Sequence, residues 1–142
     1  MNITQKKEKI LAELSEIADK DKRFEFIISL GKKHPALEES KREDRFLVKG
    51  CMSQAWLVPN LGPDGRLHFE FDSEAIIVKG IMALLMSVYN DNKPEDNLHV
   101  PPEFLADVGV TEHLSMNRRS GLANLLKQIH MYSATFKALA DR

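Results

Sequence analysis

The most apolar stretch of the chain, residues 74–90 with the sequence EAIIVKGIMALLMSVYN, constrains the fold more than any other. Its apolar residues recur at helical spacing and cover a face too wide for a helix that lies alone at a surface. We therefore predict a central helix that packs on a sheet. Met82 and Met86 would suit a protein-binding groove, but at helical spacing among isoleucines and leucines we interpret them as core. The remaining members of the face are Ile77, Val78, Ile81, Leu84, Leu85 and Val88.

Strand patterns precede this helix. In RLHFEF, residues 66–71, apolar and polar side chains alternate, which indicates a strand with one buried face. Two shorter apolar runs, 46–48 and 55–58, come earlier, and the second is followed by the turn-rich PNLGPDG. We therefore predict an α+β fold in which helices cover one face of a small three-stranded antiparallel sheet.

Helices are also predicted on both sides of this unit. The spacing indicates a helix over residues 4–18 capped by Thr4, a second capped by Asp21 and closed by Gly31 followed by His34 and Pro35, and a long one after Ser115. A short helix from Pro101 or Pro102 to Ala106 is expected between them. The length of 142 residues suits one core, so residues 1–142 are expected to form a single domain.

The overall charge excludes two classes of partner. Lysine and arginine number 20 against 21 aspartates and glutamates, so no net positive field would attract nucleic acid or anionic lipid. No run approaches the roughly 20 apolar residues of a membrane span, and the first 20 residues lack the pattern of a secretory signal. Because a single reduced thiol persists best in the cytosol, we expect a cytoplasmic protein.

That single cysteine, Cys51, lies in VKGCMSQAWL between two predicted strands. Gly50 permits unusual backbone angles beside it, and connections between strands commonly carry reactive groups. An unpaired cysteine is equally often a small buried hydrophobe, so both interpretations stay open on position alone. A reactive Cys51 would have to ionise, helped by Arg118, Arg119 or the helix start at residues 72–73.

The histidines indicate no metal site. His34, His68, His99, His113 and His130 show neither the HExxH spacing nor a partner CxxC pair, so we expect no metal. A Cys-His hydrolase, with His68 or His113 as the base for Cys51, stays open because the two groups need only meet in space. The acidic DNKPED, residues 91–96, is interpreted as a solvated loop.

Several separated motifs resemble one known family. VKGCMSQAWL, then FDSEAIIVKGIMALL, then LSMNRRSGL are similar to the SufE-type sulfur acceptors of iron–sulfur cluster assembly, and the earlier RFEFIISLGKKHPAL fits the same family. These motifs occur in the same order as in the family, and the resemblance extends from about residue 22 to residue 130. It implies an α+β fold similar to the scaffold protein of cluster assembly, with Cys51 at the tip of a loop.

The resemblance also implies a function. Cys51 would take persulfide sulfur from a SufS-like cysteine desulfurase, stimulate that enzyme and pass the sulfur to an iron–sulfur scaffold. The pyridoxal phosphate belongs to the desulfurase, so this chain would need no cofactor and would not itself be an enzyme. Asp72 and Arg118 match the family's D-S and R-x-x-G-L motifs, and with Gly50 and Ser53 they are expected to bind the partner or to surround the thiol.

Three points stay open at this level. The chain could serve a different desulfurase route, or it could act as an adaptor that binds a desulfurase without covalent chemistry. A homodimer is possible. The sequence also leaves open whether Cys51 is buried until a partner draws its loop out.

Overall fold

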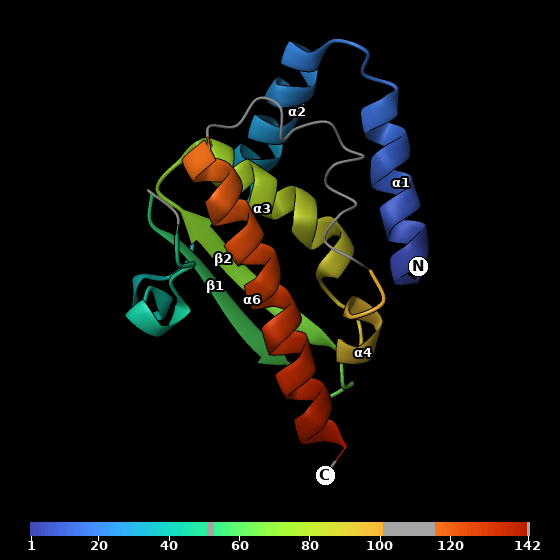
Figure 1. Ribbon diagram of the computed structural model, residues 1–142, viewed down its shortest axis with the longest axis vertical. Coiled ribbons are helices and arrows are strands. Elements are labelled where there is room, and N and C mark those ends of the chain that lie inside the picture. The colour runs from blue at the N-terminus through green and yellow to red at the C-terminus, as the bar shows by residue number, and fades with distance from the viewer. Residues whose placement is uncertain (51–52, 101–115, 142) are drawn as a thin grey trace.

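The computed structural model describes residues 1–50, 53–100 and 116–141, with the side chains of 116–118 excepted. Figure 1 shows the strands lying behind the long C-terminal helix, with the other helices above and beside them. The elements are α1 (Ile3–Ser15), α2 (Lys20–Lys33), the 3₁₀ turns η1 (Glu39–Lys41) and η2 (Asp44–Phe46), β1 (Ala55–Leu61), β2 (Leu67–Ser73), α3 (Ile76–Tyr89), α4 (Pro94–Asn97) and α6 (Met116–Ala140).

The N-terminal helices begin earlier than their sequence pattern predicted. Asn2, rather than Thr4, caps α1 in a reciprocal capping box with Gln5. Asp19, rather than Asp21, caps α2 by accepting the N–H groups of Asp21 and Lys22. Asparagine and aspartate are both good caps, so the pattern alone could not choose between neighbouring candidates.

α2 ends at Lys33 with His34 as its C-cap, within the predicted stop signal, and Gly31 itself still lies inside the helix. It is the point where α2 meets α3. A Cβ on Gly31 would lie 2.8 Å from the backbone nitrogen of Gly80, and a Cβ on Gly80 would overlap the carbonyl of Ile27. The two glycines therefore let the backbones of α2 and α3 approach closely.

The sheet has two strands in the described residues, which corrects the prediction of three. β1 and β2 are antiparallel, with Ala55 opposite Ser73 and Leu61 opposite Leu67. The predicted first strand, 46–48, reaches β1 only through an isolated bridge between Leu47 and Trp56 and through one bond, Val48 N–H to Ala55 O, of 2.8 Å.

Residues 46–48 do not form a third strand because of the turn that precedes them. The N–H groups of Phe46 and Leu47 donate to the carbonyls of Glu43 and Asp44, which closes η2 and its last turn. Those donors are therefore unavailable to a sheet ladder, because each backbone N–H is a single donor. Gly50, with φ of +83°, then turns the chain away from any extended path.

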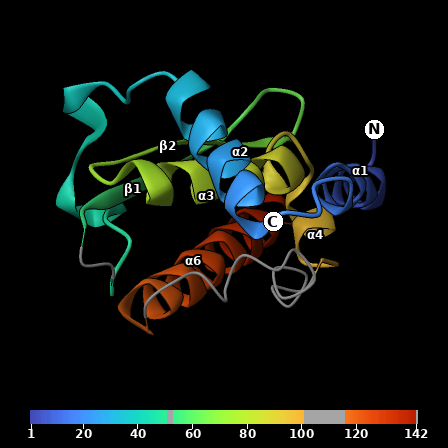
Figure 2. The same ribbon diagram turned by 90° about the horizontal axis from the view of Figure 1, so that it is seen from above.

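The two faces of the hairpin are covered differently. Figures 1 and 2 show α6 running across the strands. On that face Phe69 lies against Tyr132 of α6, with 6.4 Å between ring centres. The opposite face holds a small separate cluster formed by Leu37, Trp56 and Val58, against which Phe46 and Leu47 pack. The main core consists chiefly of the other β1 and β2 side chains with α3 and the middle of α6.

The C-terminal half partly follows the predicted pattern. The predicted long C-terminal helix is present as α6, and its residues Leu122, Leu125, Leu126 and Ile129 are buried. Within DNKPED, predicted to be a loop, residues 94–96 belong to the one-turn helix α4, and Asn97 at its end meets Ser133 of α6. The predicted helix between residues 101 and 106 and the cap Ser115 lie outside the described residues. Within the described parts of the chain, no helix has the length and apolar character needed to cross a membrane.

Candidate functional site

Cys51 itself lies outside the described residues, but the chain on both sides of it is held in place. On the N-terminal side, Val48 is bonded to Ala55 across the base of the loop. On the C-terminal side, the carbonyl of Gln54 accepts bonds from the Ser73 hydroxyl at 2.9 Å and from the Glu74 N–H at 3.0 Å. The segment that carries the cysteine is therefore a short connection with anchored ends.

Gly50 lies against the C-terminal helix. Its φ of +83° belongs to the left-handed region, which side chains with a Cβ rarely adopt. A Cβ at this position would also overlap the side-chain amide of Asn124 in α6. Backbone conformation and space therefore both favour glycine at this position, while the part of Gly50 in the site stays a prediction. Ser53, another predicted site residue, is half-buried just before Gln54.

Asp72 is a buried carboxylate with partners on three segments. Its side chain is 4% exposed. Oδ2 accepts the Leu37 N–H at 2.9 Å and the Arg42 guanidinium at 2.7 Å, while Oδ1 accepts the Ser73 N–H and lies 3.2 Å from Lys79 Nζ. These contacts tie the chain before η1 to β2 and to α3.

The charge of Asp72 is stabilised by these contacts. Burial by itself raises the pKa of this carboxyl, but the N–H groups of Leu37 and Ser73 and the ammonium of Lys79 outweigh it, so the pKa lies below its usual value. Asp72 is thus ionised at neutral pH. A role in partner binding or in the thiol environment stays a prediction, because its described contacts lie within the fold.

Sequence reasoning missed Arg42. It belongs to the charged run EESKREDR, residues 38–45, which resembles an ordinary solvated turn. In the structure its guanidinium pairs with Asp72 and lies 4.9 Å from the centre of the Trp56 ring. A cation over an indole face is attracted by the ring's quadrupole. No local pattern signals this contact, because its partners follow much later in the chain.

Arg118 can be placed only by its backbone. It lies in the first turn of α6. Asn124, whose side chain lies beside Gly50, comes later in the same helix, about 9 Å further along its axis. Gly121 and Leu122 of the same motif are buried. The structure therefore brings two predicted motifs to opposite ends of the cysteine loop: residues 72–73 beside Gln54, and the start of α6 on the side of Gly50.

His68 does not suit the role of a base for Cys51. It is paired with Asn60 near the turn, whereas Ala55 and Ser73 lie at the end that carries the cysteine loop. At about 3.3 Å per residue, His68 is roughly 17 Å along β2 from Ser73. His113, the other predicted base, lies outside the described residues.

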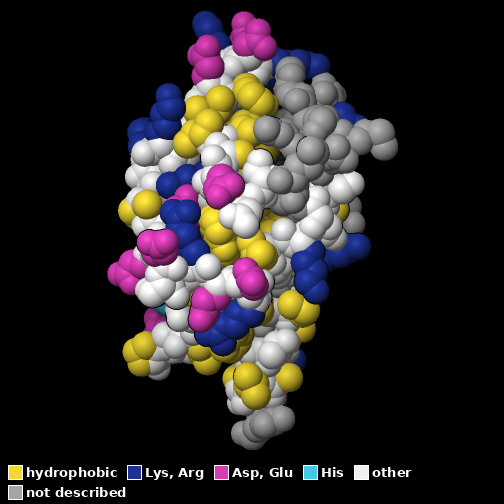
Figure 3. All heavy atoms as spheres, turned by 90° about the vertical axis from the view of Figure 1, so that its left-hand side faces the viewer, with side chains coloured by type: hydrophobic (Ala, Val, Ile, Leu, Met, Phe, Trp, Pro, Cys, Tyr) yellow, Lys and Arg dark blue, Asp and Glu magenta, His cyan; other side chains and the backbone are white. Residues whose placement is uncertain are grey.

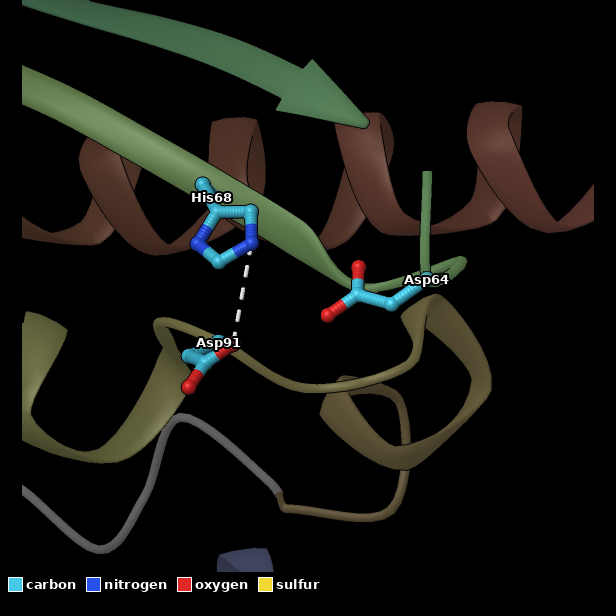
Figure 4. A group of neighbouring side chains, drawn as sticks. All are labelled: Asp64, His68 and Asp91. Atoms are coloured by element: carbon cyan, nitrogen blue, oxygen red, sulfur yellow. Dashed lines mark ion pairs between the residues drawn. The ribbon is translucent and has the colours of Figure 1, made fainter. Parts of the chain in front are cut away.

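One group of side chains in the described parts has the composition of a metal site. Asp64, His68 and Asp91 place one potential ligand atom each within 4.8 Å of one another. Figure 4 shows the three side chains, with a dashed line between His68 and Asp91. His68 Nε2 lies 3.6 Å from Asp91 Oδ1.

The same acids already face cations. Arg66 Nε is 3.8 Å from Asp64, and both Arg66 and Lys6 donate to the backbone carbonyl of Asp91. Because the three side chains are also substantially exposed, we interpret the group as a surface ion-pair cluster.

The outer surface carries both signs of charge. On the face shown in Figure 3, acidic and basic side chains are interspersed with hydrophobic patches. This mixture matches the net charge of −1 for the whole chain. No single sign of charge dominates this face, so it has none of the uniform positive field that would attract a nucleic-acid backbone.

Comparison with known proteins identifies the relatives of this fold. A solution structure of a hypothetical protein from Thermus thermophilus is similar with a TM-score of 0.77 and 21% identity, over 94% of this chain and 96% of that chain. That likeness shows the shared fold. The family model described as SufE, Fe-S metabolism associated domain, matches residues 8–133. The chain therefore belongs to the SufE family and is associated with Fe–S metabolism.

Proposed function

We propose that this protein is a cytoplasmic sulfur carrier that accepts persulfide sulfur on Cys51. The donor is a pyridoxal-phosphate-dependent, SufS-like cysteine desulfurase, and the sulfur then passes to an iron–sulfur scaffold. Membership of the SufE family supports the connection with Fe–S metabolism. The observation that carries the proposal furthest is that the chain has one cysteine, in a short connection whose two ends are anchored.

The transfer needs only one nucleophile from this chain. The Cys51 thiolate attacks the outer sulfur of the donor's persulfide, a new S–S bond forms on Cys51, and the donor's S–S bond breaks. The donor cysteine leaves as a thiolate, so electrons and charge balance without another oxidant or reductant. By clearing the donor's persulfide, the carrier frees the desulfurase for its next turnover and so stimulates it without being an enzyme itself.

A single cysteine also suits a carrier. A second thiol within reach would attack the persulfide and release the sulfur while forming a disulfide. The bond between the Ser73 hydroxyl and the Gln54 carbonyl anchors the C-terminal base of the loop. Asp72, Arg118, Gly50 and Ser53 are proposed to support the partner surface or the thiol environment.

The test is intact mass spectrometry after incubation with free cysteine and a SufS-like desulfurase from the same organism. We expect a gain of one sulfur atom that reductant removes and that is absent in Cys51→Ser. Ser15→Ala serves as the control because it alters an exposed hydroxyl at the end of α1 and leaves the thiol and the predicted site unchanged. If Cys51→Ser still stimulates the desulfurase fully, the protein is a non-covalent adaptor and the carrier proposal fails.

A further inference from the structure

A groove of about 410 Å³ runs between the chain that enters the cysteine loop and the middle of α6. One wall is formed by Arg45, Leu47 and Lys49, and the other by α6 residues that include Asn124 and Lys127. It is separate from the Asp72 contacts, because none of its lining residues touches that carboxylate. The fold thus presents a second feature beside the loop.

The groove is basic in an otherwise balanced protein. Three cations, Arg45, Lys49 and Lys127, line it, and no acidic residue does among those that the structure describes. Arg45 is partly neutralised by Glu43 at 2.7 Å. Lys49 and Lys127 are exposed, and within the described residues neither ammonium has an ion-pair partner. The local charge therefore favours an acidic ligand, although the chain as a whole carries a net charge of −1.

Apolar side chains lie between these cations. Leu47 and Tyr132 are half-buried, and Met131 is 56% exposed although it is a large hydrophobic residue. Methionine and tyrosine are enriched at protein interfaces, and methionine adapts its shape to a partner. A groove with an apolar floor and a basic rim suits a protein segment better than it suits a small anion alone.

The groove begins at the residues that lead into the cysteine loop. Lys49 precedes Cys51 by two residues in the sequence, and Gly50 packs on Asn124, a lining residue. A protein docked in this groove would therefore contact the residues that lead directly into the reactive loop. This continuity links the groove to the sulfur-transfer partner rather than to an unrelated ligand.

We propose that this groove binds an acidic segment of the cysteine desulfurase, an inference that rests on the proposed function for the identity of the partner. A carrier must meet the donor, take sulfur and leave in every cycle. Complementary charge speeds association without requiring a long-lived complex. The basic rim would steer the desulfurase, and the apolar floor would hold its segment while Cys51 reacts.

The test reverses the charge of two lysines in the groove and, in a matched control variant, of two exposed lysines outside it. Lys49→Glu/Lys127→Glu changes the net charge by the same amount as Lys9→Glu/Lys22→Glu, which alters exposed lysines of α1 and α2. Binding to the purified SufS-like desulfurase is measured by calorimetry at low and physiological salt. We expect the groove variant to bind at least about ten-fold more weakly at low salt, and the control to bind like the wild type.

Three results of the binding measurements overturn the proposal. They are unchanged binding of a folded groove variant to the desulfurase, equal weakening of that binding by the control variant, and a groove variant whose binding is weakened only to the iron–sulfur scaffold. Circular dichroism and thermal unfolding establish that each variant folds, and Lys49→Gln/Lys127→Gln should give an intermediate loss.

The readout separates this proposal from the proposed function. If wild-type protein never gains sulfur, the carrier function fails whatever the binding data show. If the wild type gains sulfur and the groove variant recovers that gain at saturating desulfurase, the groove acts in docking as proposed. A groove variant that is saturated with desulfurase yet gains no sulfur overturns a docking role, because Lys49 and Lys127 would then act in the transfer itself.

Discussion

Trp56 and Asp72 lie directly opposite each other in the β1–β2 pair, and a single side chain, Arg42, contacts both. Opposite residues of an antiparallel pair project from the same face. The guanidinium pairs with the carboxylate while it lies over the indole ring. One arginine therefore fastens the segment before β1 to the outer face of the sheet, close to the strand ends that anchor the cysteine loop.

The first prediction concerns the buried carboxylate. Asp72→Asn removes the charge that faces Arg42 and Lys79 and leaves both cations with a weaker partner. We expect a loss of about 2 kcal/mol in the free energy of unfolding, because removing one member of a buried ionic network costs more than breaking an exposed pair. Denaturant unfolding measures it. Glu70→Gln, in the exposed pair with Lys41, should cost much less; equal losses would contradict this interpretation.

The second prediction concerns pH. The pKa of Asp72 is lower in the folded protein than the value of about 3.9 in an unfolded chain. Its charge therefore stabilises the fold above about pH 4, and this stabilisation is lost as the pH falls through the folded pKa. The stability difference between wild type and Asp72→Asn should shrink over that acidic range. Urea unfolding measured from pH 7 downward tests this, and a difference that stays constant would refute it.

The third prediction concerns the crossing of α2 and α3. Gly80→Ala places a Cβ against the carbonyl of Ile27, so the helices must separate. We expect a net loss of about 2 kcal/mol despite the better helix propensity of alanine, because the obstacle is backbone and cannot rotate away. Thermal and denaturant unfolding measure the change.

A comparison variant for this prediction is Gly65→Ala, where a Cβ meets no atom within 4 Å but φ is +78°. It should cost about 1 kcal/mol through backbone strain alone. If Gly80→Ala were no worse than Gly65→Ala, the close approach of the two helices would be incorrect.

The fourth prediction concerns the loop entrance. Gly50→Ala introduces strain at a positive φ and an overlap with Asn124, so we expect a stability loss of about 1–2 kcal/mol. Under the proposed function, sulfur uptake by Cys51 should also slow. Adding Asn124→Ala removes the overlap but not the strain, so it should restore part of each loss. Unfolding measurements and the initial rate of mass gain test both effects; a complete rescue would show that strain contributes nothing.

Local patterns predicted much of the fold because local physics determines those parts. The alternation in residues 66–71 predicted β2, and the apolar spacing in 74–90 predicted α3, since each element must bury one face whatever its neighbours are. The lone cysteine directly after Gly50 likewise indicated the candidate site, which stays a prediction. These inferences need only the period of an element and the chemistry of one side chain.

The predicted strand over residues 46–48 did not form because the preceding turn uses its backbone donors. The run 46–48 has a strand-like composition, but the N–H groups of Phe46 and Leu47 are bonded within the preceding turn. Composition does not reveal which of two available acceptors a backbone donor will choose. The role of Asp72 near the thiol or a partner stays a prediction, and the contacts described for it are with Leu37, Arg42, Ser73 and Lys79.

The sequence by itself determined the helical and strand periods, the single thiol and the family motifs, because these depend on neighbours along the chain. Only the tertiary structure decided that Arg42 meets Asp72 and Trp56, that Gly31 meets Gly80, and that Lys49 and Lys127 line one groove. Each of those contacts joins residues far apart in the sequence. Such pairs form only when the whole core packs, so no local pattern carries their signal.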